Sequence, residues 1–300
     1  MNDHTSEIKT RDIPRIPRVP STPSAFVRAF WPPLPVWQRL DATVLAMTVY
    51  TAIVISIENT FEIHLPSWGG GSTILNALIL GVLLGFRNKE AYDRWWEGRK
   101  LWGQLVNDSR NLALKVAALP NFSPEGREVM SRLIPGFAIA LKHRLRDEQQ
   151  LQRVPGFEHE LEQPRHVPLF LAGRVFALLQ AERAAGRIND YDFLMLDPHA
   201  RAFMDVCGAC ERVKSSPIPL SYRSLLRHGL VLYLISTPWM IAEHLVWWTL
   251  PVMAMFTYFM TGIEMTAEDV EQPFGRDEDD LALSAFCETI RLSVTEALQL

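Results

Sequence analysis

Four stretches of this chain contain no Asp, Glu, Lys or Arg, and they limit its fold more than any other feature. They cover residues 42–57, 63–86, 229–242 and 245–263. A transmembrane helix needs about 20 consecutive apolar residues, so most of these stretches are close to or below the required length. Length therefore leaves two interpretations open: four membrane spans, or four buried helices of a soluble bundle.

The positive charges around these stretches favour the membrane interpretation. If all four cross a bilayer, residues 58–72 and the turn at Glu243 and His244 share one side, which contains no Lys or Arg. The opposite side receives the basic residues that flank the spans: Arg39, Arg87, Lys89, Arg94, Arg99, Lys100, Arg223 and Arg227. This is the positive-inside pattern, and it predicts that both termini are cytoplasmic. We expect spans at about 40–58, 70–87, 226–243 and 245–263.

Composition agrees with a chain that is part membrane and part aqueous. Hydrophobic residues make up 48% of it, and its mean hydropathy is +0.02, between a typical soluble chain and a transporter packed with spans. A net charge of −4 does not suggest a nucleic-acid partner, because a phosphate-binding surface needs a local excess of Lys and Arg. Residues 1–35 are Pro-rich and basic, and we expect them to form a cytoplasmic arm.

The stretch GVLLGFRNKEAYDRWWEGRKLWGQL, residues 81–105, passes from uncharged to highly charged sequence without a helix break. From Ala91 onward, apolar and small residues recur in steps of four and three: Ala91, Trp95, Gly98, Trp102, Leu105, Ser109, Leu112 and Val116. This spacing predicts a helix that leaves the membrane and becomes a wall of a cytoplasmic helical domain over 88–222. Gly81 and Gly85 predict a close helix contact, and Glu90 is placed to pair with Arg94.

Other local signals also indicate helices. Ser123-Pro124 and Asp197-Pro198 each place a capping side chain before a proline, as at a helix start. No alternating strand pattern or glycine-rich nucleotide loop occurs. The predicted fold class is therefore all-α: a polytopic helical membrane protein with a cytoplasmic helical domain.

Three segments are similar to the bestrophin family of channels: FRNKEAYDRWWEGRKLWG, SSPIPLSY before the third span, and EQPFGRDEDD after the fourth. The resemblance implies a bacterial-type ion channel of the inner (plasma) membrane, over 36–264, followed by a cytoplasmic acidic segment and helix over 265–300. It implies a homopentamer with four transmembrane helices per subunit and a central pore lined by the second span. Small monovalent ions would pass, with chloride as the family's usual type. A sodium-selective channel of the same fold and a non-conducting membrane scaffold remain alternatives.

The resemblance also assigns roles to residues of the second helix. Leu78, Val82 and Phe86 lie at i, i+4 and i+8 and match the family's apolar neck, where rings of such side chains gate by dewetting. An apolar stripe could instead pack against the first or third span. The motif formed by Arg94, Trp95, Trp96, Glu97 and Arg99 would hold the helix junction. A second, cytoplasmic constriction would lie at Val213 or Ile218, of which we favour Val213.

Ion selectivity stays open at this stage. Ring edges of Phe86 facing the axis would favour anions and ring faces cations, because an aromatic ring has a positive edge and a negative face. Glu58, Glu62 and His64 lie in the expected outer loop, where carboxylates could concentrate cations at the pore mouth or simply be solvated.

The acidic segment raises the question of a metal. It corresponds to part of the calcium-binding clasp of animal bestrophins, which makes Asp277, Asp279 and Asp280 weak calcium candidates. Here Arg276 stands where the animal pattern has an acid, and a fixed positive charge weakens an oxygen-ligand site. We favour instead an interaction of the acids with the N-terminal dipole of the helix DEDDLALSAFCETIRL. No cofactor and no calcium control are predicted.

Catalytic and zinc motifs are not apparent. Cys207 and Cys210 form a C-x-x-C without a second pair or a nearby His in the sequence. They share a helical face with Phe203, Val206 and Val213, which predicts core packing. No H-E-x-x-H and no spacing typical of a catalytic triad occurs, so an enzyme is not predicted.

Overall fold

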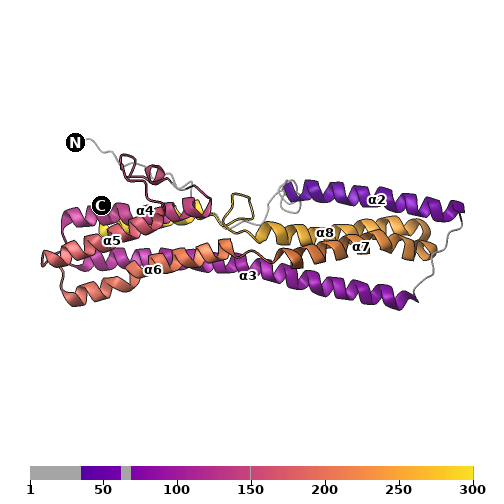
Figure 1. Ribbon diagram of the computed structural model, residues 1–300, viewed down its shortest axis with the longest axis horizontal. Coiled ribbons are helices and arrows are strands. Elements are labelled where there is room, and N and C mark those ends of the chain that lie inside the picture. Colours follow the sequence, from indigo (N-terminus) through magenta and orange to yellow (C-terminus); the bar gives the residue numbers. More distant parts are fainter. Residues whose placement is uncertain (1–34, 62–68, 149, 300) are drawn as a thin grey trace, which may run out of the picture.

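A computed structural model describes residues 35–61, 69–148 and 150–299, and within these ranges every regular element is helical (Figure 1). The α-helices are α2 (Pro35–Phe61), α3 (Gly69–Ala118), α4 (Pro124–Leu145), α5 (Val167–Ala184), α6 (Asp190–Ser215), α7 (Leu220–Leu245), α8 (Thr249–Val270) and α9 (Leu283–Leu298). Two 3₁₀ turns, η1 (Leu151–Arg153) and η2 (Val246–Trp248), complete the set. The all-α prediction is confirmed.

The molecule is elongated and has two helical halves (Figure 1). The start of α3 lies with α2, α7 and α8 in one half, and its remainder lies with α4, α5, α6 and α9 in the other. With 50 residues, α3 is about 75 Å long and belongs to both halves. The sequence prediction of one helix that continues from the apolar part into the charged part is confirmed.

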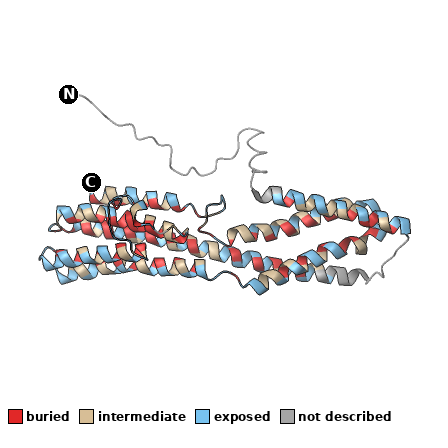
Figure 2. Cartoon of the chain, turned by 45° about the horizontal axis from the view of Figure 1, so that its top comes forward, coloured by how far each residue is buried: buried red, intermediate tan, exposed pale blue. Residues whose placement is uncertain are grey.

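The half that contains α2, α7 and α8 has a small interior and an apolar exterior. Its core is formed by Leu80, Leu84, Leu230, Leu234 and Met253. Two stretches of the described residues, 39–61 and 220–270, are long and apolar enough to cross a membrane, with 22% and 28% of their most apolar window buried. Exposed residues alternate with intermediate and buried ones along these helices in Figure 2. An apolar helix with an apolar exterior suits lipid rather than water.

The other half has the larger core. The predicted seam of α3 is buried there, with Trp102, Leu105, Leu112 and Val116 fully shielded. Packed against it are residues of α4, α6 and α9 (Figure 2). The prediction that Cys207 and Cys210 are core residues is confirmed, because both thiols are buried.

One predicted helix start is confirmed and one is wrong. Ser123 caps α4, and its hydroxyl accepts a hydrogen bond from the Gly126 N–H at 3.0 Å. Pro198, in contrast, lies inside α6. That helix begins earlier because Asn189 and Asp192 form a reciprocal capping box. An internal proline lacks its N–H donor and crowds the preceding turn, and α6 tolerates this.

Candidate functional site

The predicted neck residues lie on an exposed face of α3. Leu78, Val82 and Phe86 are 62%, 48% and 57% exposed in the single chain, whereas Leu80 and Leu84 are 6% and 1% exposed. The buried leucines pack against α7 and α8. The alternative interpretation, in which the neck stripe packs against the first or third span, is therefore wrong for the subunit.

This exposed face is wider than a single stripe. Leu75 and Ile79 are also exposed. Apart from the backbone of α3 itself and the neighbouring residues, no atom of the described residues lies within 4 Å of the position that a Cβ would take at Gly81 or Gly85. Within the described part of the subunit, the close helix contact expected at the two glycines is thus not made. The face offers apolar surface to lipid, to further copies of the chain, or to a path between copies.

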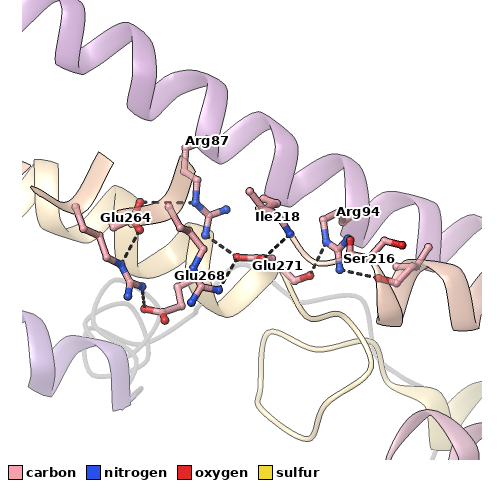
Figure 3. A network of polar contacts seen from close by, with 10 residues as sticks. Arg87, Arg94, Ser216, Ile218, Glu264, Glu268 and Glu271 are labelled. Carbon is pink, nitrogen blue, oxygen red and sulfur yellow. Dashed lines mark hydrogen bonds and ion pairs between the residues drawn. The ribbon is translucent and has the colours of Figure 1, made fainter. Parts of the chain in front are cut away.

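Directly after Phe86, the chain places a fully buried guanidinium. Arg87 is 0% exposed, and its Nη2 donates to Glu271 Oε2 at 2.7 Å (Figure 3). Its Nε lies 3.9 Å from Glu264 Oε2. The other carboxylate oxygen of Glu271 accepts from the Ile218 N–H at 3.2 Å. These contacts join α3 to the end of α8 and to the segment before α7.

Further charges extend this network along α7 and α8. Arg227 contacts Glu264 at 3.3 Å and Glu268 at 2.7 Å, and Arg223 lies 3.6 Å from Glu271. We call this set the junction network: Arg87, Arg223, Arg227, Glu264, Glu268 and Glu271 (Figure 3). Nε and Nη1 of Arg87 have no hydrogen-bond partner among the described residues. A buried charge is tolerated only when it is paired, so the network fixes the position of α3 at this level.

Arg94 holds α3 about two turns further along the helix. Its guanidinium donates to the carbonyls of Glu271 at 3.1 Å, Val213 at 2.7 Å and Ser216 (Figure 3). Burial lowers the pKa of Arg94 below its ordinary value, and the Glu271 carboxylate offsets part of that effect. The expected pair with Glu90 does not form, because the guanidinium is directed to the ends of α6 and α8 instead.

The rest of the predicted junction motif surrounds Arg94. Trp95 Nε1 donates to the Asp279 carbonyl at 3.1 Å, and the Trp95 and Trp96 rings stack at 6.5 Å between centroids. Glu97 pairs with Arg212 of α6 at 3.1 Å. The Arg99 guanidinium lies 4.8 Å from the ring centroid of Phe286 on α9. The motif residues thus link α3 to α6, to α9 and to the segment between α8 and α9.

The other predicted pore residues are less favourably placed. Val213 and Ile218 are buried within the subunit, which argues against either side chain forming a second constriction. Glu58 lies inside α2 rather than in a loop and is buried. Glu62 and His64 lie outside the described residues.

The acidic segment is not a helix cap, so that interpretation is wrong. It precedes α9 as a turn, in which Asp280 Oδ2 accepts from the Asp277 N–H at 2.7 Å. Leu281 N–H donates to the Pro273 carbonyl at 2.9 Å, which folds the segment back before α9 begins. Arg276 forms an ion pair with Glu148. A positively charged residue therefore directly precedes the calcium candidates Asp277, Asp279 and Asp280 in the chain.

One potential metal-ligand group is present in the described ranges: His166, Cys207 and Glu211. The sequence did not indicate that His166 lies near Cys207. Its Nδ1 accepts from the Leu169 N–H at 3.1 Å, so a neutral imidazole carries its proton on Nε2, toward Glu211 at 3.2 Å. Burial raises the pKa of Cys207 to about 12. A protonated thiol and a protonated ring nitrogen do not favour metal binding.

Together these features define a class: an all-helical membrane-type protein. Its long helix α3 has an exposed apolar face, and directly after that face the helix joins a buried network of charged residues. The family model for the bacterial and fungal bestrophin proteins matches residues 21–296. The chain therefore belongs to the bestrophin family.

Relatives with similar length support this assignment. The voltage-dependent anion channel-forming protein alr2987 of Nostoc sp. is 33% identical over 237 residues, which are 76% of this chain and 77% of that protein. The voltage-dependent anion channel-forming protein sll1024 of Synechocystis sp. is 32% identical over 279 residues, 88% and 90% of the two chains. A solved bacterial bestrophin homologue from Klebsiella pneumoniae matches with a TM-score of 0.78 and 25% identity, covering 88% of this chain and 98% of its own.

Proposed function

We propose that this protein is an anion channel of the bacterial inner membrane, in which copies of the chain, five by family resemblance, surround a pore lined by α3. The observation that carries the proposal is the exposure of Leu78, Val82 and Phe86 beside the buried Leu80 and Leu84. The relatives alr2987 and sll1024 are named anion channel-forming proteins, which supports anions as the cargo. Rings of apolar side chains in such a pore would gate by dewetting.

A current measurement tests the cargo. The purified protein is placed in a planar bilayer with unequal sodium chloride on the two sides. A reversal potential near the chloride equilibrium value is the expected result. A value near the sodium equilibrium potential would replace anions with monovalent cations in the proposal.

The two faces of α3 provide a matched test of the neck. Leu78→Ala and Val82→Ala remove exposed side chains, so we expect higher conductance with little loss of stability. Leu80→Ala and Leu84→Ala remove buried side chains of the same helix and should destabilise the subunit by about 2–5 kcal/mol. Unchanged conductance in both neck variants, with folded and oligomeric protein, would refute the neck role of these residues. Absence of current in the wild type and in both variants would favour a non-conducting scaffold.

Calcium control is not part of the proposal, since Arg276 lies beside the acidic segment. We expect the current to be unchanged between buffers with added calcium and buffers with a chelator. The oligomeric state is checked by native mass spectrometry, where a mass of five chains is expected. Reporter fusions at the two ends test the proposed cytoplasmic location of both termini.

A further inference from the structure

A cleft of about 400 Å³ lies away from the neck, where the ends of α4 and α6 meet the segment between α8 and α9. Four of its lining residues are cationic, namely Arg94, Arg146, Lys214 and Arg276, and one is an acid, Asp147. Pro273 and Phe274 contribute apolar wall. A volume of this size is typical of small-molecule sites.

The carboxylates in and around the cleft already have partners. Asp147 Oδ1 lies 2.6 Å from Lys214 Nζ, and Glu148 pairs with Arg276. Asp280 Oδ2 accepts from the Asp277 N–H at 2.7 Å. Arg94 is likewise engaged, since its donors reach three backbone carbonyls.

Arg146 differs from these residues. Its Nε donates to the Phe274 carbonyl at 3.3 Å, but no ion pair joins it to a carboxylate in the part of the chain that the structure describes. The pKa of Arg146 lies below its ordinary value, because of burial first and then because of the positive charge of Arg276. A guanidinium that is partly desolvated and repelled by a second one is stabilised by an anion between them.

The dipoles of the helix ends account for only some of the cationic residues that line the cleft. Cations near a helix C-terminus interact favourably with its dipole, which accounts for Lys214 in the last turn of α6. Arg276 lies on no helix, and its side chain is 67% exposed. No helix dipole accounts for its charge at the cleft, where its partner is the Glu148 carboxylate.

We propose that this basic cleft binds a phosphate group, held by Arg146 and Arg276 with Lys214 beside them. Guanidinium groups match phosphate oxygens with paired donors, and a phosphate carries enough charge to neutralise more than one of them. The group could belong to a soluble phosphate compound in the cytoplasm or to the headgroup of an anionic lipid, because the same donors recognise both. The occupied cleft would link the ends of α4 and α6 to the segment after α8.

Calorimetric titration of the full chain tests the site. The protein is held in detergent free of anionic lipid, in a chloride buffer of constant ionic strength, and titrated with inorganic phosphate. We expect one saturable site per chain. Arg146→Gln and Arg276→Gln should each weaken binding about tenfold or more, the usual loss for a charge-assisted contact. Arg201→Gln is the matched control, because Arg201 is an exposed arginine of α6 that does not line the cleft.

A second arm identifies the source of the phosphate group. Short-chain phosphatidylglycerol is titrated into the same detergent-held protein, and the melting temperature is recorded. Saturable stabilisation by this lipid, without a calorimetric response to phosphate, would assign the cleft to a headgroup. Absence of binding in both arms, or binding that Arg276→Gln leaves intact, would overturn the proposal. Since Arg276 is exposed, its variant should fold normally, and neither arm depends on ion conduction.

Discussion

Substitution of Glu271 by Gln should test how far the junction network holds α3 in place. The change keeps the size of the side chain and an acceptor for the Ile218 N–H, but it removes the charge that faces Arg87 Nη2 at 2.7 Å. Arg87 would then retain only Glu264, whose oxygen is 3.9 Å from Nε. A fully buried guanidinium would lose its main counter-charge.

The size of the effect follows from burial. Removing one partner of a buried ion pair costs about 3–5 kcal/mol, because the remaining charge stays desolvated. With an unfolding entropy of roughly 2 cal/mol/K per residue, that loss lowers the melting temperature of a 300-residue chain by about 5–8 °C. The double variant Arg87→Met, Glu271→Gln removes both charges and should recover a large part of the loss.

Melting temperatures of the wild type, Arg87→Met, Glu271→Gln and the double variant form a double-mutant cycle. They are measured in one detergent by size-exclusion chromatography with fluorescence detection. Lys89→Gln is the matched control: its ion pair with Asp93 is as short, at 2.6 Å, but lies exposed in the same region of α3. Solvent screens such a pair, so the control should have the same melting temperature as the wild type. Equal melting temperatures for Glu271→Gln and the control would refute the role given to the network.

Two further predictions concern the half that contains α4, α5, α6 and α9. The thiols of Cys207, Cys210 and Cys287 are all buried, and burial raises the pKa of Cys207 and Cys287 to about 12. Maleimide should therefore label the three cysteines only after denaturation. Rapid labelling of the native protein would contradict their burial. Burial alone would raise the pKa of Glu182, but hydrogen bonds from Arg187 and Ser123 outweigh it and lower the pKa. Its stabilising contribution is therefore present above about pH 4.3, the ordinary carboxyl value, and is lost as the pH falls through the lower folded-state pKa. Urea unfolding against pH should show this acid-side loss, and Glu182→Gln should reduce it.

Periodic features were predictable from the sequence, because they depend on neighbours along one helix. The seam from Ala91 to Val116 and the core face around Cys207 follow from apolar spacing alone. Both are buried in the structure, except for Trp95, which is partly buried. The cap at Ser123 is equally local. Asp197-Pro198 gave the same local signal and was misleading, because Asn189 starts the helix earlier and Pro198 is accommodated inside α6.

Contacts between distant segments were not predictable in the same way. In the sequence, Arg87 is only one of several basic residues that flank a predicted span. Its partner Glu271 is 184 residues away, so local spacing does not indicate the pair. A signal did exist: Arg87 and Glu264 each end an uncharged stretch on the same predicted side of the membrane. Opposite charges at matching depths of adjacent spans are candidates for pairing, since an isolated charge there is costly.

The ion pair between Arg87 and Glu271 also influences which way the proposed neck residues face. Lipid gives no hydrophobic driving force for helix association, so the rotation of a span about its axis depends on packing and polar contacts. The hydrophobic core that α3 shares with α7 and α8 is small, and α3 contributes only Leu80 and Leu84 to the buried residues of that core. Phe86 and Arg87 are successive residues, about 100° apart around the helix, and one is exposed while the other is fully buried. Holding Arg87 against Glu271 therefore also directs Phe86, and with it Val82 and Leu78, away from the subunit. Since Arg94 binds the same end of α8, a shift of α8 would act on α3 at this level. In the proposed channel, a small rotation of α3 there would change which side chains face the pore.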